Sequence, residues 1–162
     1  MRPQYFHIKG GLQITVLGSA ASLALALPSF SNPITLEAGS ATQVTQTGSE
    51  YTIIGGDLSA DGQNLFHSFE AFGLSQAQIA NFLTNPDVQA VLERINEGSA
   101  SHIDGLLQVT GSSADLYLIN PSGILFGPHA ALNLAESFTA VTANGSTDSP
   151  AAAAIAVPIS TP

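Results

Sequence analysis

Pairs of apolar residues recur through the middle of the chain, and the two members of each pair have one residue between them. They are Leu107/Val109, Leu116/Leu118, Ile124/Phe126 and Leu132/Leu134. This alternation is typical of short strands that bury one face. Turn-forming segments separate the pairs: Gly111-Ser112-Ser113, Asn120-Pro121-Ser122-Gly123 and Gly127-Pro128. The pattern therefore predicts a series of short strands joined by tight turns.

The spacing of these pairs is nearly constant. Their first members lie 9, 8 and 8 residues apart, so Leu132 follows Leu107 by 25 residues. Three short strands within that length predict an all-β parallel β-helix with three faces, in which each coil buries its inward residues on the next. A β-sandwich is the second interpretation, because two apolar residues per strand also fit that architecture.

The first half of the domain follows a less regular pattern. Three β-prone pieces are separated by glycine-containing turns and predict further short strands: residues 34–36, 43–45 and 51–54. Near 75–95 the pattern changes, since Asn85 and Pro86 form a helix-start signal. Four apolar residues follow at the spacing of a helix face: Val88, Val91, Leu92 and Ile95. We therefore expect a short amphipathic helix or an irregular excursion there, packed on the side of the β core.

Both ends of the chain predict segments outside this fold. Basic residues near the start precede an uncharged run that ends at Ser31, which is the layout of a secretory signal peptide over residues 1–31. A retained N-terminal anchor is the alternative. Residues 144–162 are rich in Ala and Pro and predict a low-complexity tail. The folded domain is expected over residues 32–143.

The charge balance narrows the possible partners. The 162 residues include 12 Asp and Glu but 3 Lys and Arg, which gives a formal charge of −9, and there is no Cys. Nucleic-acid binding is excluded, because almost nothing is left to neutralise phosphates. Without Cys there is no disulfide framework and no thiolate zinc site. The acidic chain predicts a partner with basic or backbone-donor surfaces.

Residues able to support catalysis or metal binding are scattered. Asp57 and Asp61 lie in a Gly-rich loop that lacks the number of ligands Ca²⁺ needs, so a solvated turn is favoured. His67, His102 and His129 lack the spacing of zinc ligands, and we expect them on the surface or the rim. The sequence thus predicts no cofactor, no metal site, no catalytic residue and no small-molecule substrate.

Several motifs follow one another in a fixed order along residues 32–143. They are Asn64-Leu-Phe-His-Ser-Phe-Glu-Ala-Phe72, Arg94-Ile95, Ser101-His-Ile-Asp-Gly105, Leu116-Tyr-Leu-Ile-Asn-Pro-Ser-Gly-Ile-Leu-Phe-Gly127 and Ser137-Phe-Thr-Ala140. Together they resemble the filamentous-haemagglutinin N-terminal secretion domain, the two-partner secretion (TPS) domain. The Asn-Pro-x-Gly-Ile signature of that family maps onto Asn120, Pro121, Gly123 and Ile124, with Ser122 in place of the usual second Asn.

The resemblance implies an exoprotein of the two-partner secretion pathway in a Gram-negative-type bacterium. Its domain would be a monomeric, right-handed parallel β-helix with an N-terminal cap. The Sec machinery and signal peptidase would process the leader. The POTRA domains of an Omp85-like outer-membrane transporter would then recognise the chain in the periplasm. Folding of the first coils at the cell surface would seed those behind them, and the product would reach the cell surface or the extracellular space.

Two motif regions are the candidates for transporter recognition. They comprise Asn120, Pro121, Ser122, Gly123, Ile124, Asn64, Phe66 and Phe69. Asn, Pro and Gly at the first, second and fourth positions specify a type I turn, so a folding corner is an equally open interpretation of the first region. The phenylalanines, three residues apart, also fit core packing. Residues 59–73 are expected to be exposed, with a backbone that could add to a sheet edge of the transporter.

Two other classes of function compete with secretion. An autonomous surface adhesin would share the fold and would need an exposed aromatic patch or further repeats. A β-helical polysaccharide lyase or hydrolase would need converging carboxylates with a basic partner, and outside the first ten residues the chain has a single Arg or Lys, Arg94.

Overall fold

The computed structural model describes residues 34–96, 98–142 and 154–157 as an all-β solenoid of about four turns. The predicted signal peptide, 1–31, lies outside the described residues, as does most of the predicted tail. Among the described residues there is no helix, and so none long and apolar enough to cross a membrane.

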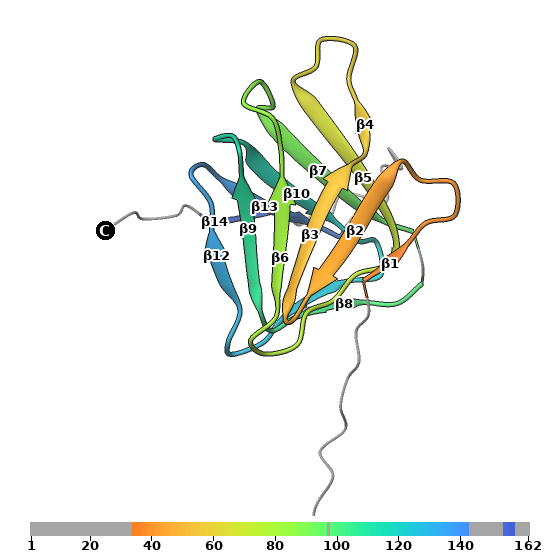
Figure 1. Ribbon diagram of the computed structural model, residues 1–162. Helices are drawn as coiled ribbons and strands as arrows, with labels where there is room; N and C mark the ends of the chain where they lie inside the picture. The colour runs from red at the N-terminus through yellow and green to blue at the C-terminus, as the bar shows by residue number, and fades with distance from the viewer. Residues whose placement is uncertain (1–33, 97, 143–153, 158–162) are drawn as a thin grey trace, which may run out of the picture.

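Three sheets form the faces of the solenoid (Figure 1). The largest has the order β1-β5-β7-β10-β13-β14, with β4 also paired to β5. Its strands are β1 (Thr35–Leu36), β4 (Asp57–Leu58), β5 (Asn64–Ala71), β7 (Ala90–Ile95), β10 (Asp115–Ile119), β13 (Phe138–Val141) and β14 (Ala154–Val157). The second sheet has the order β12-β9-β6-β3-β2, and the third pairs β11 with β8. Their strands are β2 (Thr42–Thr47), β3 (Glu50–Gly55), β6 (Ile79–Leu83), β8 (Ser101–Ile103), β9 (Leu106–Thr110), β11 (Ile124–Phe126) and β12 (Ala131–Asn133).

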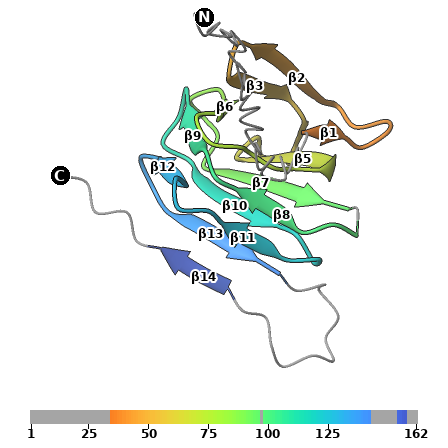
Figure 2. The same cartoon turned by 90° about the horizontal axis from the view of Figure 1, so that it is seen from below.

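Successive coils visit the three sheets in turn, so strands from neighbouring coils stack in parallel (Figure 2). One coil runs through β6, β7 and β8, and the next through β9, β10 and β11. Leu132 lies opposite Leu107 in the parallel pair of β12 and β9. The stacking predicted from the 25-residue separation is therefore confirmed, and the sandwich interpretation is wrong.

The predicted inward residues form much of the core. Leu107, Val109, Leu116, Leu118 and Leu134 are buried. Ile124 and Leu132 are partly buried, and Phe126 is 47% exposed, contrary to expectation. Within the described residues, β11 and β12 are the last strands of their sheets, so no further coil covers these side chains. The edge of the Phe126 ring contacts Phe138, with ring centroids 5.9 Å apart.

The helix expected near 75–95 is wrong. This region forms β6 and β7, and β7 pairs in parallel with β5 on one side and β10 on the other. Asn85 does start a turn, since its Oδ1 accepts a hydrogen bond from the Asp87 N–H and its carbonyl accepts one from the Val88 N–H. Two complete hydrogen-bond ladders outweigh the small helix preference of a six-residue segment. The alternation of the strand turns Leu92 outward and brings Glu93 inward.

The first strands close the N-terminal end of the solenoid. The expected β-prone pieces form β1, β2 and β3, and β2 pairs antiparallel with β3. At the other end, β14 pairs antiparallel with β13, so a strand forms within the segment expected to be a tail. The first strands therefore form the predicted N-terminal cap, and the parallel coils follow them in sequence order as far as β13 (Figure 1).

Candidate functional site

The Asn-Pro-Ser-Gly segment forms a corner between β10 and β11. The carbonyl of Asn120 accepts a hydrogen bond from the Gly123 N–H at 3.1 Å, which closes the predicted turn. Gly123 has a φ of +114°, a conformation that side chains with a Cβ rarely adopt. Pro121 and Ser122 lie on the outside of this corner and are exposed.

Asn120 is completely buried and links the corner to two neighbouring coils. Its Nδ2 donates to the carbonyl of Ser99 at 3.0 Å and to Ser101 Oγ at 2.9 Å, both on the preceding coil. Its Oδ1 accepts from the Ser122 N–H at 2.9 Å, and its own N–H donates to the Val141 carbonyl. Every polar group of Asn120 is therefore used inside the protein, and in the folded state its side chain is inaccessible to a partner.

Other residues of the same motifs also join one coil to the next. The carboxylate of Asp104 accepts a hydrogen bond from the His129 N–H at 2.8 Å, 25 residues further along the chain. This bond and a second one from the His129 side chain lower the pKa of Asp104. Asp115 in turn accepts hydrogen bonds from the N–H and the hydroxyl of Ser137. The motif residues thus act as links between coils.

The second candidate region divides between the inside and the outside of β5. Asn64 is half-buried and donates from its backbone N–H to Ser59 Oγ at 2.9 Å, which fixes the loop before the strand. Phe66 is 42% exposed on the outer face. Phe69 is fully buried and packs against Phe72, with ring centroids 5.2 Å apart. In the folded state, Phe66 is the exposed residue of these three.

The backbone of β5 has no free edge in the folded protein. It pairs with β7 along one side, and with β4 and β1 along the other. Between β4 and β1, the Ser68 carbonyl accepts from the Glu37 N–H, and the Ser68 N–H donates to Thr42 Oγ1. The expectation that residues 59–73 offer an open sheet edge is therefore wrong for the folded state.

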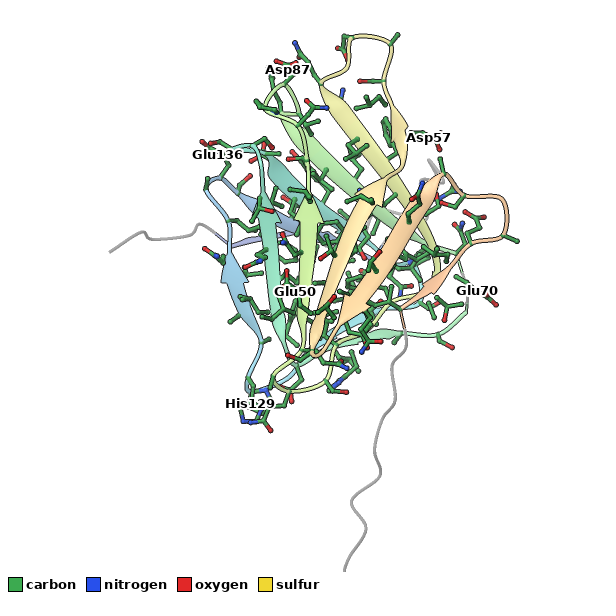
Figure 3. The ribbon with its side chains drawn as sticks, viewed as in Figure 1. Glu50, Asp57, Glu70, Asp87, His129 and Glu136 are labelled. Atoms are coloured by element: carbon green, nitrogen blue, oxygen red, sulfur yellow. The ribbon has the colours of Figure 1, made fainter. Side chains whose placement is uncertain are left out.

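The carboxylates do not converge on one site. Figure 3 shows Asp57, Asp87, Glu70 and Glu136 on separate elements, with His129 at the opposite end of the ribbon from Asp87. Asp61 is held in a turn by hydrogen bonds from Ser59 Oγ and the Gln63 N–H, and both bonds lower its pKa. Among the described residues, no group of three or more His, Asp or Glu side chains is arranged to hold a metal ion.

One histidine was misplaced by sequence reasoning. His67 is 1% exposed and points into the solenoid, whereas surface or rim positions were expected for all three body histidines. Its register partner on β7 is Glu93, which is also completely buried and was not singled out from the sequence. The alternation of buried residues along β5 and β7 would have revealed both, once β7 was recognised as a strand.

An apolar cavity of about 280 Å³ lies at the C-terminal end of the solenoid. It lies between the last described strands of the three sheets. Its lining is Ile103, Phe126, Gly127, Ala130, Ala131, Leu132, Phe138 and Ala140. The cavity lies beside β11, β12 and β13, at the C-terminal end of the described coils.

Comparison with known proteins agrees with this architecture. A solved structure, the HMW1 secretion domain from Haemophilus influenzae, shares the fold with a TM-score of 0.53 and 24% sequence identity. The similarity covers 67% of the present chain and 27% of that chain. No curated protein sequence matches the chain.

A family model described as the TPS secretion domain matches residues 33–155. This domain is a non-catalytic secretion module. Exoproteins that carry it are secreted across the outer membrane, and its presence implies recognition by a TpsB transporter. Since the match spans most of the sequence and includes all the corner motifs, the chain belongs to the TPS secretion domain family.

Proposed function

We propose that the chain is recognised in the periplasm by the POTRA domains of an Omp85-type transporter and that its coils close only on emergence, where they seed folding of the exoprotein behind them. In this proposal the signal peptide directs the chain through the Sec machinery into the periplasm, and signal peptidase removes residues 1–31. The folded product remains at the cell surface or in the medium as part of an adhesin-like exoprotein.

The observation that carries this proposal is the use of Asn120 inside the fold. Its side chain is buried and joins consecutive coils, so the signature motif serves coil closure once the chain is folded. A transporter that reads Asn120 or the backbone of β5 must therefore meet the chain before these contacts form. Recognition of an extended chain followed by folding outside satisfies both requirements.

The topology also supports vectorial folding of the chain. Each coil contacts the coil before it through parallel pairs, as β7 pairs with β5 and β10 with β7. Burial is gained only as successive coils stack, because one coil cannot bury its own inner face. A chain that folds on the outside is therefore held there by each new coil, and no ATP is required.

Co-expression with the cognate transporter tests the proposal. Wild-type chain is expected in the medium only when the transporter is present. The double variant Asn120→Ala/Gly123→Val, which removes the corner, is expected to accumulate in the periplasm. Asn133→Ala is the matched control, because Asn133 is exposed on β12.

Variants in the buried and the exposed half of the motif distinguish a role in folding from a role in recognition. Pro121→Ala/Ser122→Ala changes the exposed half of the corner and leaves the hydrogen bonds of the Asn120 side chain in place. If the outer half contacts the transporter, this variant loses more export than its measured change in folded stability accounts for. Secretion of the chain without any transporter, or undiminished export of the Asn120→Ala/Gly123→Val variant, contradicts the proposed function.

A further inference from the structure

Two ionisable side chains lie side by side inside the solenoid. On β5, His67 alternates with buried apolar neighbours and faces inward, and on β7 Glu93 does the same. The parallel register of the two strands places His67 next to Glu93 on consecutive coils. Their exposed fractions are 1% and 0%. We call these two residues the inner polar pair.

The inner polar pair lacks hydrogen-bond partners. His67 Nδ1 lies 3.2 Å from Thr42 Oγ1, but no described residue offers a partner to His67 Nε2 or to either carboxylate oxygen of Glu93. The other buried polar residues differ in this respect, since Ser101 and Asn120 bond each other. Glu93 is therefore the one buried polar side chain among the described residues whose polar atoms all lack a partner.

The surroundings of the pair are apolar. The His67 ring lies 5.7 Å from the ring centroid of Phe82 and 6.3 Å from that of Phe69. On the far side of Glu93, its register neighbour on β10 is Leu118. Gly56 closes over the imidazole, because a Cβ at that position would come within 3.0 Å of His67 Nδ1. Gly56 and the two phenylalanine rings thereby shield the imidazole from solvent, and Glu93 is itself fully buried.

Few charges face the pair from the elements packed against it. Burial lowers the pKa of His67, and the negative charge of Asp57, on β4, offsets only part of that shift. The buried residues of β3, β6, β9 and β10 are apolar: Ile53, Ala80, Phe82, Leu107, Val109, Leu116 and Leu118. Neither member of the pair therefore has a charged partner that compensates for the loss of water.

We propose that the inner polar pair is a folding brake: closing the coil of β7 onto that of β5 strips water from Glu93 and His67 without giving Glu93 a hydrogen bond, so the closed coils are less stable and form more slowly than an all-apolar core would allow. This inference rests on the proposed function for its use, which is to keep the chain extended until the transporter has passed it. The physical effect itself does not depend on the transporter.

The protonation states set the pH range in which the brake acts. Burial raises the pKa of Glu93 well above its usual value and lowers that of His67 to about 4. The folded state thus holds a protonated Glu93 and a neutral His67. The stability that Glu93 contributes is present below its unfolded pKa of about 4.3 and is lost as the pH rises, whereas that of His67 is present above about 6.5 and is lost as the pH falls.

Between about pH 4.3 and 6.5 the two dependences oppose each other, and above 6.5 only that of Glu93 remains. Burial favours the protonated form of Glu93 in the folded chain, so folding takes up at most one proton at this group. The equilibrium constant for unfolding is therefore expected to rise with pH above 6.5, by at most about tenfold for each pH unit. Raising the pH above 6.5 thus strengthens the brake.

Denaturant unfolding of the full chain between pH 6.5 and 8.5 tests the proposal. Glu93→Gln keeps the shape and removes the ionisation, and Glu93→Met also removes the buried polar atoms. Glu70→Gln is the matched control, since Glu70 is exposed on β5 and the same charge is lost. We expect Glu93→Gln to lose the pH dependence, and Glu93→Met to lower the unfolding constant about tenfold or more at pH 8 and to refold faster. Glu70→Gln should behave as the wild type.

The brake is overturned if Glu93→Gln keeps the wild-type pH dependence, or if neither Glu93 variant is more stable than Glu70→Gln at pH 8. If Glu93→Met disturbs the packing of the core, Glu93→Gln still tests the proposal, because it keeps the shape of the side chain and removes only the ionisation. A further arm measures export with the transporter, where Glu93→Met is expected to leave more protease-resistant chain in the periplasm. If Glu93→Met changes the stability but not the export of the chain, only the role of the brake in export is overturned. If the wild type is not exported at all, the proposed function is contradicted instead.

Discussion

Asn120 shows how one side chain can determine the geometry of several coils. It closes its own turn, bonds the preceding coil at Ser99 and Ser101, and meets the following coil through Val141. The Asn-Pro-x-Gly spacing predicted the turn from sequence. The bonds to the other coils were not predictable, because they join residues about 20 positions apart.

Asn120→Ala is expected to destabilise the folded chain by about 2–3 kcal/mol, since it leaves Ser101 Oγ and the Ser122 N–H without their buried partner. Denaturant unfolding measures this change. Asn133→Ala, on the exposed face of β12, should change the stability by less than about 0.5 kcal/mol. Equal effects of the two substitutions would show that the corner contacts contribute nothing to stability.

Asp104 is a second link between coils, and it makes a pH-dependent contribution. Its folded pKa lies below the usual value because it accepts hydrogen bonds from His129. The stability it supplies is therefore present above its unfolded pKa of about 3.9 and is lost as the pH falls through the folded pKa.

Asp104→Asn should lower the thermal midpoint at pH 7, and the difference from the wild type should shrink below about pH 4, where the carboxylate is protonated first in the unfolded chain and, at lower pH, in the folded chain. Melting curves over this range check the prediction. Glu136→Gln, a change at an exposed carboxylate, serves as the control. A difference from the wild type that is constant down to pH 2 would contradict the role of the Asp104 charge.

At the scale of the element, parallel pairing decides what each segment becomes. The repeated pairs at 107–109, 116–118 and 132–134 predicted their strands correctly, since each segment is itself β-prone. The helix predicted over residues 85–95 was wrong. Asn-Pro and the apolar spacing give a local helix signal there, whereas β5 and β10 impose an extended backbone from both sides. The same error hid Glu93, which belongs to the outer face of the predicted helix and to the inner face of the real strand.

Pairing also predicts how stability varies among the strands. Amides of β7 and β10 have parallel neighbours on both sides, whereas among the described residues β11 pairs with β8 alone and β12 with β9 alone. Amide hydrogen exchange of the full chain should therefore be slowest in β7 and β10 and fastest in β11 and β12. Uniform protection across the four strands would contradict a solenoid whose end coils open first.

At the scale of the whole molecule, the solenoid is a sequential structure that is built coil by coil. Its fold class followed from the spacing of a few apolar pairs, because a parallel β-helix repeats one geometry along the chain. The closed edges of β5 and the interior position of the motif asparagine required the structure, since both depend on which strands meet. Under the proposed function, these features require the transporter to recognise the chain before it folds.

The order of recognition and folding can be measured with a single buried cysteine. Ala80, on β6, is 0% exposed, and β6 pairs with β3 and β9. The chain has no cysteine of its own. A thiol reagent therefore modifies Ala80→Cys in the extended chain but not in the closed coils, and Asn133→Cys, exposed on β12, is the control that is modified in both states.

The most direct test of coil closure after export is the reactivity of the thiol at position 80 in each compartment during co-expression with the transporter. The account predicts a thiol that is modified in chain captured in the periplasm and protected in chain recovered from the medium. A periplasmic chain whose thiol is already protected and which is still exported would show that the coils close before transport, and would contradict the account.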